Sequence, residues 1–328
     1  MRAKVGGLEA VSVGIVVADV VARPVQGSAG RGQLELVEEI LLCSGGSAAS
    51  TGYALARFGI SSAVIGRVGQ DGFGDFLANE AARHGAQSLL IRDPQAATSA
   101  TQVLVDPEGE RTFIHAIGAN ARLTPADVPL AELRARGAKL LHLAGFFALP
   151  GMDDPEGAPA ARLLAQALEL GFLTSLDNVW DATGRWERIH AVLPYSDFFF
   201  PSIHDARHIT GKWEPKAVAE ELFALGVRQV VALKMGPEGA WVISRRGERY
   251  RLGALAVPAV DGTGAGDAFI AGFLAGWLRG RGLCECGQLG SAAGAMCVRA
   301  VGAMPGITDW AELESMAQQV PVLSGGDL

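Results

Sequence analysis

The 328-residue sequence is poor in charged residues, and it has no run of basic residues. Only 19% of the residues are charged and 49% are hydrophobic, a composition that excludes intrinsic disorder and allows a large buried core. Lysine and arginine number 28 against 35 aspartates and glutamates, which gives a net charge of −7. A negative chain without a basic run lacks the electrostatic means to bind nucleic acid.

Cysteines and long apolar runs are also scarce. The four cysteines (Cys43, Cys284, Cys286 and Cys297) are too few for a disulfide scaffold, and no second close pair completes a zinc site with Cys284 and Cys286. The apolar stretch 11–22 is interrupted by Asp19 and is shorter than the ~20 residues that a membrane span needs. We therefore expect a cytoplasmic protein with reduced thiols and no membrane partner.

Glycine, in contrast, is abundant, with 43 residues that lack the G-X-Y period of collagen. The glycines separate strand-like patterns from helical ones. Strands are predicted over Val11–Val17, Ala63–Val68, Lys139–Leu143, Phe172–Leu176, Asp197–Phe200, Gln229–Lys234, Ala240–Ser244 and Arg249–Val257, and helices over Ser47–Phe58, Phe73–His84, Ala158–Leu170, Trp186–Leu193, Ile203–Thr210 and Pro215–Leu225. This alternation predicts an α/β fold with a largely parallel sheet, helices on both faces and ligands beyond the carboxyl ends of the strands.

Residues 88–117 break the alternation. Three short segments with alternating apolar residues, Ser88–Ile91, Ser99–Val105 and Arg111–Ile117, are joined by turn-rich links. Together with Gln33–Leu42 they predict a small accessory sheet of antiparallel strands.

The stretch from Asp261 to Trp277 is the most informative. Its apolar residues recur every fourth position, as in a helix, and a glycine-rich turn precedes them. Such a turn at a helix start presents unpaired N–H groups to an anion. Asp267 stands within this anion site, where it serves either as a helix cap or as a base for an attacking hydroxyl.

Two common phosphate-binding motifs do not account for this turn. In the dinucleotide pattern G-x-G-x-x-G, the last glycine would stand where Asp267 is found. The P-loop pattern fails as well, because Gly211-Lys212 is followed by Trp213 rather than by serine or threonine.

The segment 261–274 resembles the D-T-x-G-A-G-D signature of the ribokinase-like (PfkB) carbohydrate kinases, with Gly262 as its one departure, and similar features run from Val11 to about Ile307. The resemblance implies a three-layer α/β/α sandwich with a mostly parallel central sheet and a small antiparallel β lid. It implies one domain over residues 1–328, with the lid formed near 20–42 and 88–117. It assigns Asp267 as the catalytic base and the backbone amides of Gly264, Ala265 and Gly266 as the anion hole.

The same resemblance implies a sugar site near the N-terminus. In it Asp19 binds hydroxyls and Gly45 and Gly46 let the substrate lie close to the backbone. Ser50 stands where the family usually has asparagine, so the identity of the sugar stays open. Asn120 either reaches the substrate or forms a turn.

For the nucleotide, the resemblance points to Ser202, Lys234, Gly236, Gly239, the backbone at Thr263, and Ser291 at the start of a small-residue helix over 291–303. Asp205 would act on Mg²⁺ through water, although Ser202, Ile203 and Asp205 all depart from the family's P-N-E-x-E element. Asp261 lies where some members bind a monovalent cation, which adds K⁺ to ATP and Mg²⁺ as an expected cofactor.

These features predict an ATP-dependent kinase that transfers the γ-phosphate to a hydroxyl of a small sugar, and a homodimer through the β lid is an open expectation. Two alternatives remain. One is a nucleoside kinase of the same fold, with Phe113, Phe146 or Phe147 stacking on the base. The other is a catalytically inactive sugar- or nucleotide-binding regulator, which the changes at Ser50 and 202–205 would favour.

Overall fold

The computed structural model describes residues 7–27, 31–154 and 156–326. Within these residues the main sheet has ten strands in the order β16-β15-β14-β13-β12-β11-β10-β1-β4-β6. The pairs from β13 to β6 are parallel and those from β13 to β16 antiparallel. The strands are β1 (Ala10–Gly14), β4 (Ser62–Ile65), β6 (Gln87–Ser88), β10 (Leu140–Phe146), β11 (Leu173–Asn178), β12 (Phe198–Phe199), β13 (Val230–Lys234), β14 (Ala240–Ser244), β15 (Arg249–Leu252) and β16 (Val322–Gly326).

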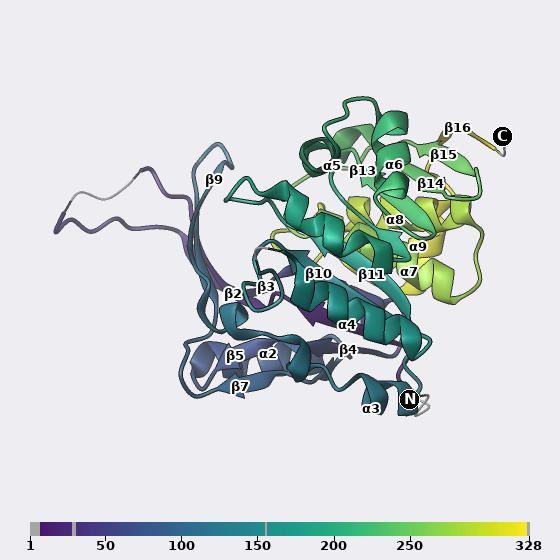
Figure 1. The fold of residues 1–328 in the computed structure, drawn as a ribbon. Helices are drawn as coiled ribbons and strands as arrows, with labels where there is room; N and C mark the ends of the chain where they lie inside the picture. The colour runs from purple at the N-terminus through teal and green to yellow at the C-terminus, as the bar shows by residue number, and fades with distance from the viewer. Residues whose placement is uncertain (1–6, 28–30, 155, 327–328) are drawn as a thin grey trace.

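Helices cover both faces of this sheet (Figure 1). Successive residues of β13 point to opposite faces of the sheet. Val230 packs against one group of helices, and Val231 packs against a second group. The first group is α1 (Ser47–Arg57), α2 (Gly72–Arg83), α7 (Ala265–Leu278), α8 (Leu283–Cys297) and α9 (Trp310–Ala317); the second is α3 (Leu130–Ala135), α4 (Ala158–Glu169), α5 (Ile203–Thr210) and α6 (Pro215–Ala224). The predicted α/β/α sandwich is confirmed. No helix of the described residues is long and apolar enough to cross a membrane.

A second sheet forms the lid and projects from the α/β body (Figure 1). Its order is β3-β2-β8-β9, from the strands β2 (Val17–Arg23), β3 (Glu39–Gly45), β8 (Ala100–Val105) and β9 (Arg111–Ala116). The outer pairs are antiparallel, whereas β2 and β8 run parallel. Residues 88–91, which we expected in this sheet, lie elsewhere: β6 is an edge strand of the main sheet, and β7 (Ile91–Asp93) pairs with β5 (Arg67–Gly69).

The predicted first strand, Val11–Val17, is two strands in two different sheets. Strand β1 ends at Gly14 in the main sheet, and β2 begins at Val17 in the lid. Between them the backbone of Val16 is held by the side-chain amide of Asn120, which accepts from its N–H at 3.3 Å and donates to its carbonyl at 3.0 Å. Asp19 therefore lies within a lid strand rather than at the end of a body strand.

Other differences concern the ends and types of elements. Residues 186–193, predicted as one helix, form two 3₁₀ turns, η3 (Trp186–Ala191) and η4 (Leu193–Tyr195). The small-residue helix predicted over 291–303 is α8, which begins at Leu283 and ends at Cys297. All four cysteines are free thiols.

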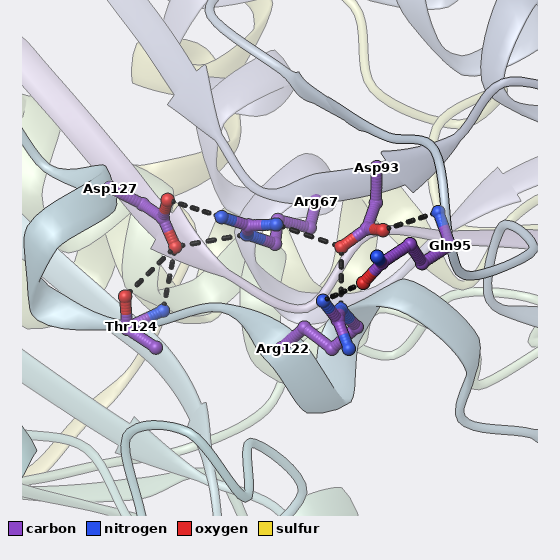
Figure 2. A network of polar contacts seen from close by, with 6 residues as sticks. All are labelled: Arg67, Asp93, Gln95, Arg122, Thr124 and Asp127. Carbon is purple, nitrogen blue, oxygen red and sulfur yellow. Dashed lines mark hydrogen bonds and ion pairs between the residues drawn. The ribbon is translucent and has the colours of Figure 1, made fainter.

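A network of ion pairs joins the base of the lid to the body (Figure 2). Arg67 of β5 makes two bonds to Asp127 (3.0 and 2.7 Å) and one to Asp93 (2.8 Å). Asp93, at the end of β7, also accepts from Arg122 (2.7 Å), the last residue of the 3₁₀ turn η1 (Gly118–Arg122). Asp93 precedes β8 and Arg122 follows β9. The network therefore holds both chain segments at the base of the β8–β9 hairpin, the one that enters it and the one that leaves it.

We expect Arg67→Met to lower the Tm by on the order of 5 °C, because it leaves the carboxylates of Asp93 and Asp127 with fewer partners. The matched control is Lys216→Met on α6, which removes an exposed pair with Glu220 and should change the Tm by about 1 °C or less. Thermal unfolding followed by circular dichroism measures both, and equal shifts for the two variants would contradict the anchoring role.

Candidate active site

Two cavities meet at the glycine-rich turn before α7. The first, about 670 Å³, lies between the lid and the body and is lined by Asp19, Arg111 and Phe113 from the lid and by residues 260–263 and 301–303 from the body. The second, about 650 Å³, is lined mainly by apolar residues of 254–259 and α8, with Lys234 and Gly266 among its polar walls. Gly262 borders both cavities, so the turn separates them.

The carboxylate of Asp261 holds this turn. Its Oδ1 accepts from the Thr263 N–H (2.9 Å) and hydroxyl (2.7 Å), and its Oδ2 accepts from the Gly302 N–H (2.8 Å). Although burial alone would raise the pKa of Asp261, these donors and the nearby Arg111 hold it below its usual range. Gly264 then takes φ 77°, and a side chain there would strike Ala303.

The helix start leaves N–H groups free. The first bond of the helical ladder runs from the Ala268 N–H to the Gly264 carbonyl at 2.8 Å, and the Ala265 N–H reaches the Gly262 carbonyl at 3.3 Å. Within the described residues, the N–H groups of Gly264 and Gly266 have no acceptor. Two of the three predicted anion-hole donors are therefore available to a ligand, at the positive end of a 14-residue helix.

Asp267 lies in the first turn of α7 and is half-buried. Desolvation raises its pKa to about 7, and the negative charge of Asp177 adds to this rise. Lys234 and a hydrogen bond from the Ser50 side chain act in the opposite direction. Ser50, at the asparagine position of the family's pattern, is thus a partner of the predicted base.

Lys234 connects this helix start to one further carboxylate, that of Asp177. Its Nζ bonds to Asp177 Oδ1 at 2.9 Å and lies beside Gly266, where an added Cβ would be 3.2 Å from it. Asp177 is the last residue but one of β11, and burial raises its pKa, as does the charge of Asp205 on α5. The carboxyl ends of β11 and β13 thus place an ion pair beside the start of α7.

The lid carries a polar row across its inner face. The strand register places Asp19 opposite Cys43 and Thr101, and Thr101 opposite His115. Thr101 hydrogen-bonds to Asp19, and its hydroxyl lies 3.0 Å from His115 Nδ1. Burial raises the pKa of Asp19 to about 6. The carboxylate lies against Gly45, where a Cβ would be only 2.0 Å from its Oδ2, so only glycine permits this approach.

Arg111 joins the lid to the turn. Its Nη1 donates to Asp261 Oδ1 and to the hydroxyl of Thr263. The first residue of β9 is therefore bonded to the residues that order the turn before α7. This side chain links the lid sheet to that turn.

Several predicted residues hold other positions. Ser202 caps α5 by accepting from the Asp205 N–H at 3.1 Å, and Asn120 is occupied by Val16. Thr263 lines the first cavity, whereas Ser291 lines the second from the middle of α8. Gly236 and Gly239 also line the second cavity, but Asp267, Ser50 and the Gly45-Gly46 pair line neither.

Sequence reasoning missed Asp177 and Arg111. Asp177 had a usable signal, a carboxylate at the carboxyl end of a predicted parallel strand, where ligands bind in such folds. Arg111 had none, because its contact with Asp261 spans 150 residues and depends on how the lid is folded over the body.

Known proteins resemble this chain over most of its length. The model of the pfkB family of carbohydrate kinases matches residues 8–310. A 6-phosphofructokinase of Thermoanaerobacterium thermosaccharolyticum is 30% identical over 83% of this chain and 84% of its own, and an Escherichia coli fructokinase is 30% identical over 84% and 92%. A 2-dehydro-3-deoxygluconokinase of Bacillus subtilis is 27% identical over 82% and 85%.

A solved structure supports the same fold. Arabidopsis thaliana ribokinase, complexed with ribose and ATP, superimposes with a TM-score of 0.78 over 95% of this chain and 99% of that one, at 21% identity.

We expect Asp267→Asn to stabilise the protein at pH 8 by about 1–3 kcal/mol and to leave it unchanged near pH 4. The raised pKa means that the folded state holds this proton more tightly than the unfolded state does. Stability is therefore lost as pH rises from about 4 to about 7, and the amide removes that loss.

Urea unfolding at a series of pH values measures the difference in the free energy of unfolding between the wild type and the Asp267→Asn variant. Asp75→Asn, on the exposed side of α2, is the matched control and should show no such rise between pH 4 and 8. The same pH dependence in both variants would contradict the burial of an ionisable Asp267.

Proposed function

The chain belongs to the pfkB family of carbohydrate kinases and is thus a phosphotransferase with an alcohol group as acceptor, and we propose that it transfers the γ-phosphate of ATP to a hydroxyl of a small sugar. One observation carries the proposal. The free N–H groups of Gly264 and Gly266 lie in the turn between two cavities, and Asp267 follows them in the same helical turn.

Asp267 acts as the general base. As the acceptor oxygen bonds to the γ-phosphorus, its proton passes to the Asp267 carboxylate, and the bond from phosphorus to the bridging oxygen breaks to release ADP. A pKa of about 7 suits this role, because the group is ionised in a large fraction of molecules and still holds the proton firmly.

The second cavity fits the nucleotide. Its apolar walls, which include Leu255, Val257 and Phe269, suit a purine, and Ser291 adds a hydroxyl. Its polar end is formed by Lys234 and Gly266, which can bind the phosphates. Charge that develops on the transferring group would be stabilised by the Gly264 and Gly266 N–H groups, which are already oriented.

The residues present fit a magnesium ion carried by the phosphates. Mg²⁺ usually takes one or two protein carboxylates together with waters and phosphate oxygens. The charge of Asp205 raises the pKa of Asp177, and Asp177 is paired with Lys234, which lines the second cavity. The two carboxylates would hold the ion, directly or through water, and the ion would neutralise phosphate charge.

Asp261 does not fit a monovalent cation. Its Oδ1 accepts from the N–H and hydroxyl of Thr263 and from Arg111, and its Oδ2 accepts from Gly302. Both carboxylate oxygens already accept hydrogen bonds, and the adjacent Arg111 guanidinium balances the negative charge. The carboxylate therefore does not require a metal cation to compensate its charge. We assign no role to K⁺ at this position.

A nucleoside kinase remains the second candidate because Phe113 lines the first cavity and offers a surface for a base. Phe146, in contrast, is fully buried in the core. Nucleosides therefore belong in the acceptor panel. ATP binding without phosphate transfer to any acceptor would favour the inactive regulator.

We further propose a homodimer through the lid. In the lid sheet, Asp19 lies on the face toward the first cavity, and the strand register places Ile40, Leu42 and Ile114 on the opposite face. The side chains of Ile40 and Ile114 are 67% and 60% exposed. Apolar side chains gathered on one sheet face are typical of a surface that another chain covers.

We expect the double variant Ile40→Asp, Ile114→Asp to be monomeric at micromolar concentrations at which the wild type is dimeric, because charges cannot be buried between two lids. Leu170→Asp, at an exposed leucine after α4, is the matched control and should stay dimeric. Sedimentation equilibrium measures this, and a monomeric wild type would contradict the proposal.

We expect Asp267→Asn to lower kcat by about 10²–10⁴-fold with little change in ATP affinity, because the amide cannot accept the proton. For the wild type, kcat/KM should fall about tenfold per pH unit below pH 7, as Asp267 takes up its proton. A coupled ADP-release assay and ATP titration measure these quantities. Asp75→Asn should keep wild-type kinetics, and an Asp267→Asn enzyme with more than a tenth of wild-type kcat would exclude this base.

A further inference from the structure

We infer that the acceptor is an uncharged sugar, without a phosphate or carboxylate group; this inference rests on the proposed function and concerns the first cavity. Acidic residues on the wall of this cavity outnumber basic ones. The acidic side chains are Asp19, Glu38, Glu39, Asp106 and Asp261, and the basic ones are Arg23 and Arg111.

Both arginines are already paired. Arg23 lies directly opposite Glu39 in the β2–β3 register, and its Nε and Nη2 bond to Glu39 Oε2 at 2.8 and 2.6 Å. Arg111 is bonded to Asp261 and Thr263. An anionic substrate would have to take a guanidinium from a carboxylate that stays in the same cavity.

Two other arginines, near the base of the lid, are bonded to carboxylates outside the first cavity. Arg67 bonds to Asp93 and Asp127 in the network of ion pairs at the base of the lid, and Arg92 bonds to Asp75 and to the Gly69 carbonyl. Neither lines the first cavity. Lys234 belongs to the second cavity and is paired with Asp177.

The remaining wall suits hydroxyl groups. The carboxylate of Asp19 accepts a hydrogen bond from Thr101 and is not paired with a cationic side chain among the described residues. A carboxylate can accept hydrogen bonds from two adjacent hydroxyls of a sugar. A phosphate in the same place would add about two negative charges beside Asp19, Glu38 and Asp106, within a partly enclosed space where screening is weak. The cavity therefore selects against charged sugars.

The test compares acceptors that differ in charge. With ATP and Mg²⁺, ADP release is measured on fructose and ribose, on fructose 6-phosphate and ribose 5-phosphate, and on 2-dehydro-3-deoxygluconate, and a thermal-shift titration reports binding of each compound. We expect kcat/KM for the better neutral sugar to exceed that for every charged compound by at least 100-fold. A charged compound turned over equally well or better would overturn this inference and leave the kinase assignment intact. No turnover of any compound, including added nucleosides and other neutral sugars, would overturn the proposed function and the inference with it.

A variant tests the stated cause. Glu39→Gln releases Arg23 from its partner and removes one negative charge, so the preference for neutral sugar over sugar phosphate should shrink at least fivefold. Glu35→Gln is the matched control, a glutamate of the connection that precedes β3 and does not line the cavity, and should leave the ratio unchanged. An unchanged ratio in Glu39→Gln, or an equal change in both variants, would overturn the electrostatic explanation.

Discussion

The bonds to the Asp261 carboxylate are the constraint on which the site depends. They order a turn that belongs to no helix or strand, and that turn forms a wall of both cavities. The N–H groups that open α7 point where they do because this turn is fixed before the helix begins. Arg111 brings the lid to the same carboxylate, so one side chain links the turn before α7 to the sheet that lines the first cavity.

Much of the fold could be predicted from periodicity, because the elements are long and their apolar faces regular. Helix α2 was predicted almost to the residue, with Asp71 accepting from the Gly74 N–H as its cap. The alternation of strands and helices likewise led to the correct layered architecture. These features depend on neighbours a few residues apart, and such contacts are visible in a sequence.

Predictions were weaker where the structure depends on distant contacts. The apolar run after Ala10 reads as one strand, yet Asn120, more than 100 residues away, holds the point at which it passes from one sheet to another. Ser202 stands at a motif position where the family has asparagine, and its hydroxyl caps α5. The pKa of Asp267 depends on Asp177, which lies next to it only through the arrangement of β11 and α7.

The alternation along the lid strands sets a rule for how this protein can change during evolution. Along β2, Asp19 and Arg23 face the cavity, while Val20 and Ala22 face the other way. Inserting one residue within β2 would exchange the faces of the residues on one side of the insertion, turning Asp19 or Arg23 away from the first cavity and apolar groups toward it. Insertions and deletions should therefore accumulate in the connection between β2 and β3 and be absent from the strands themselves.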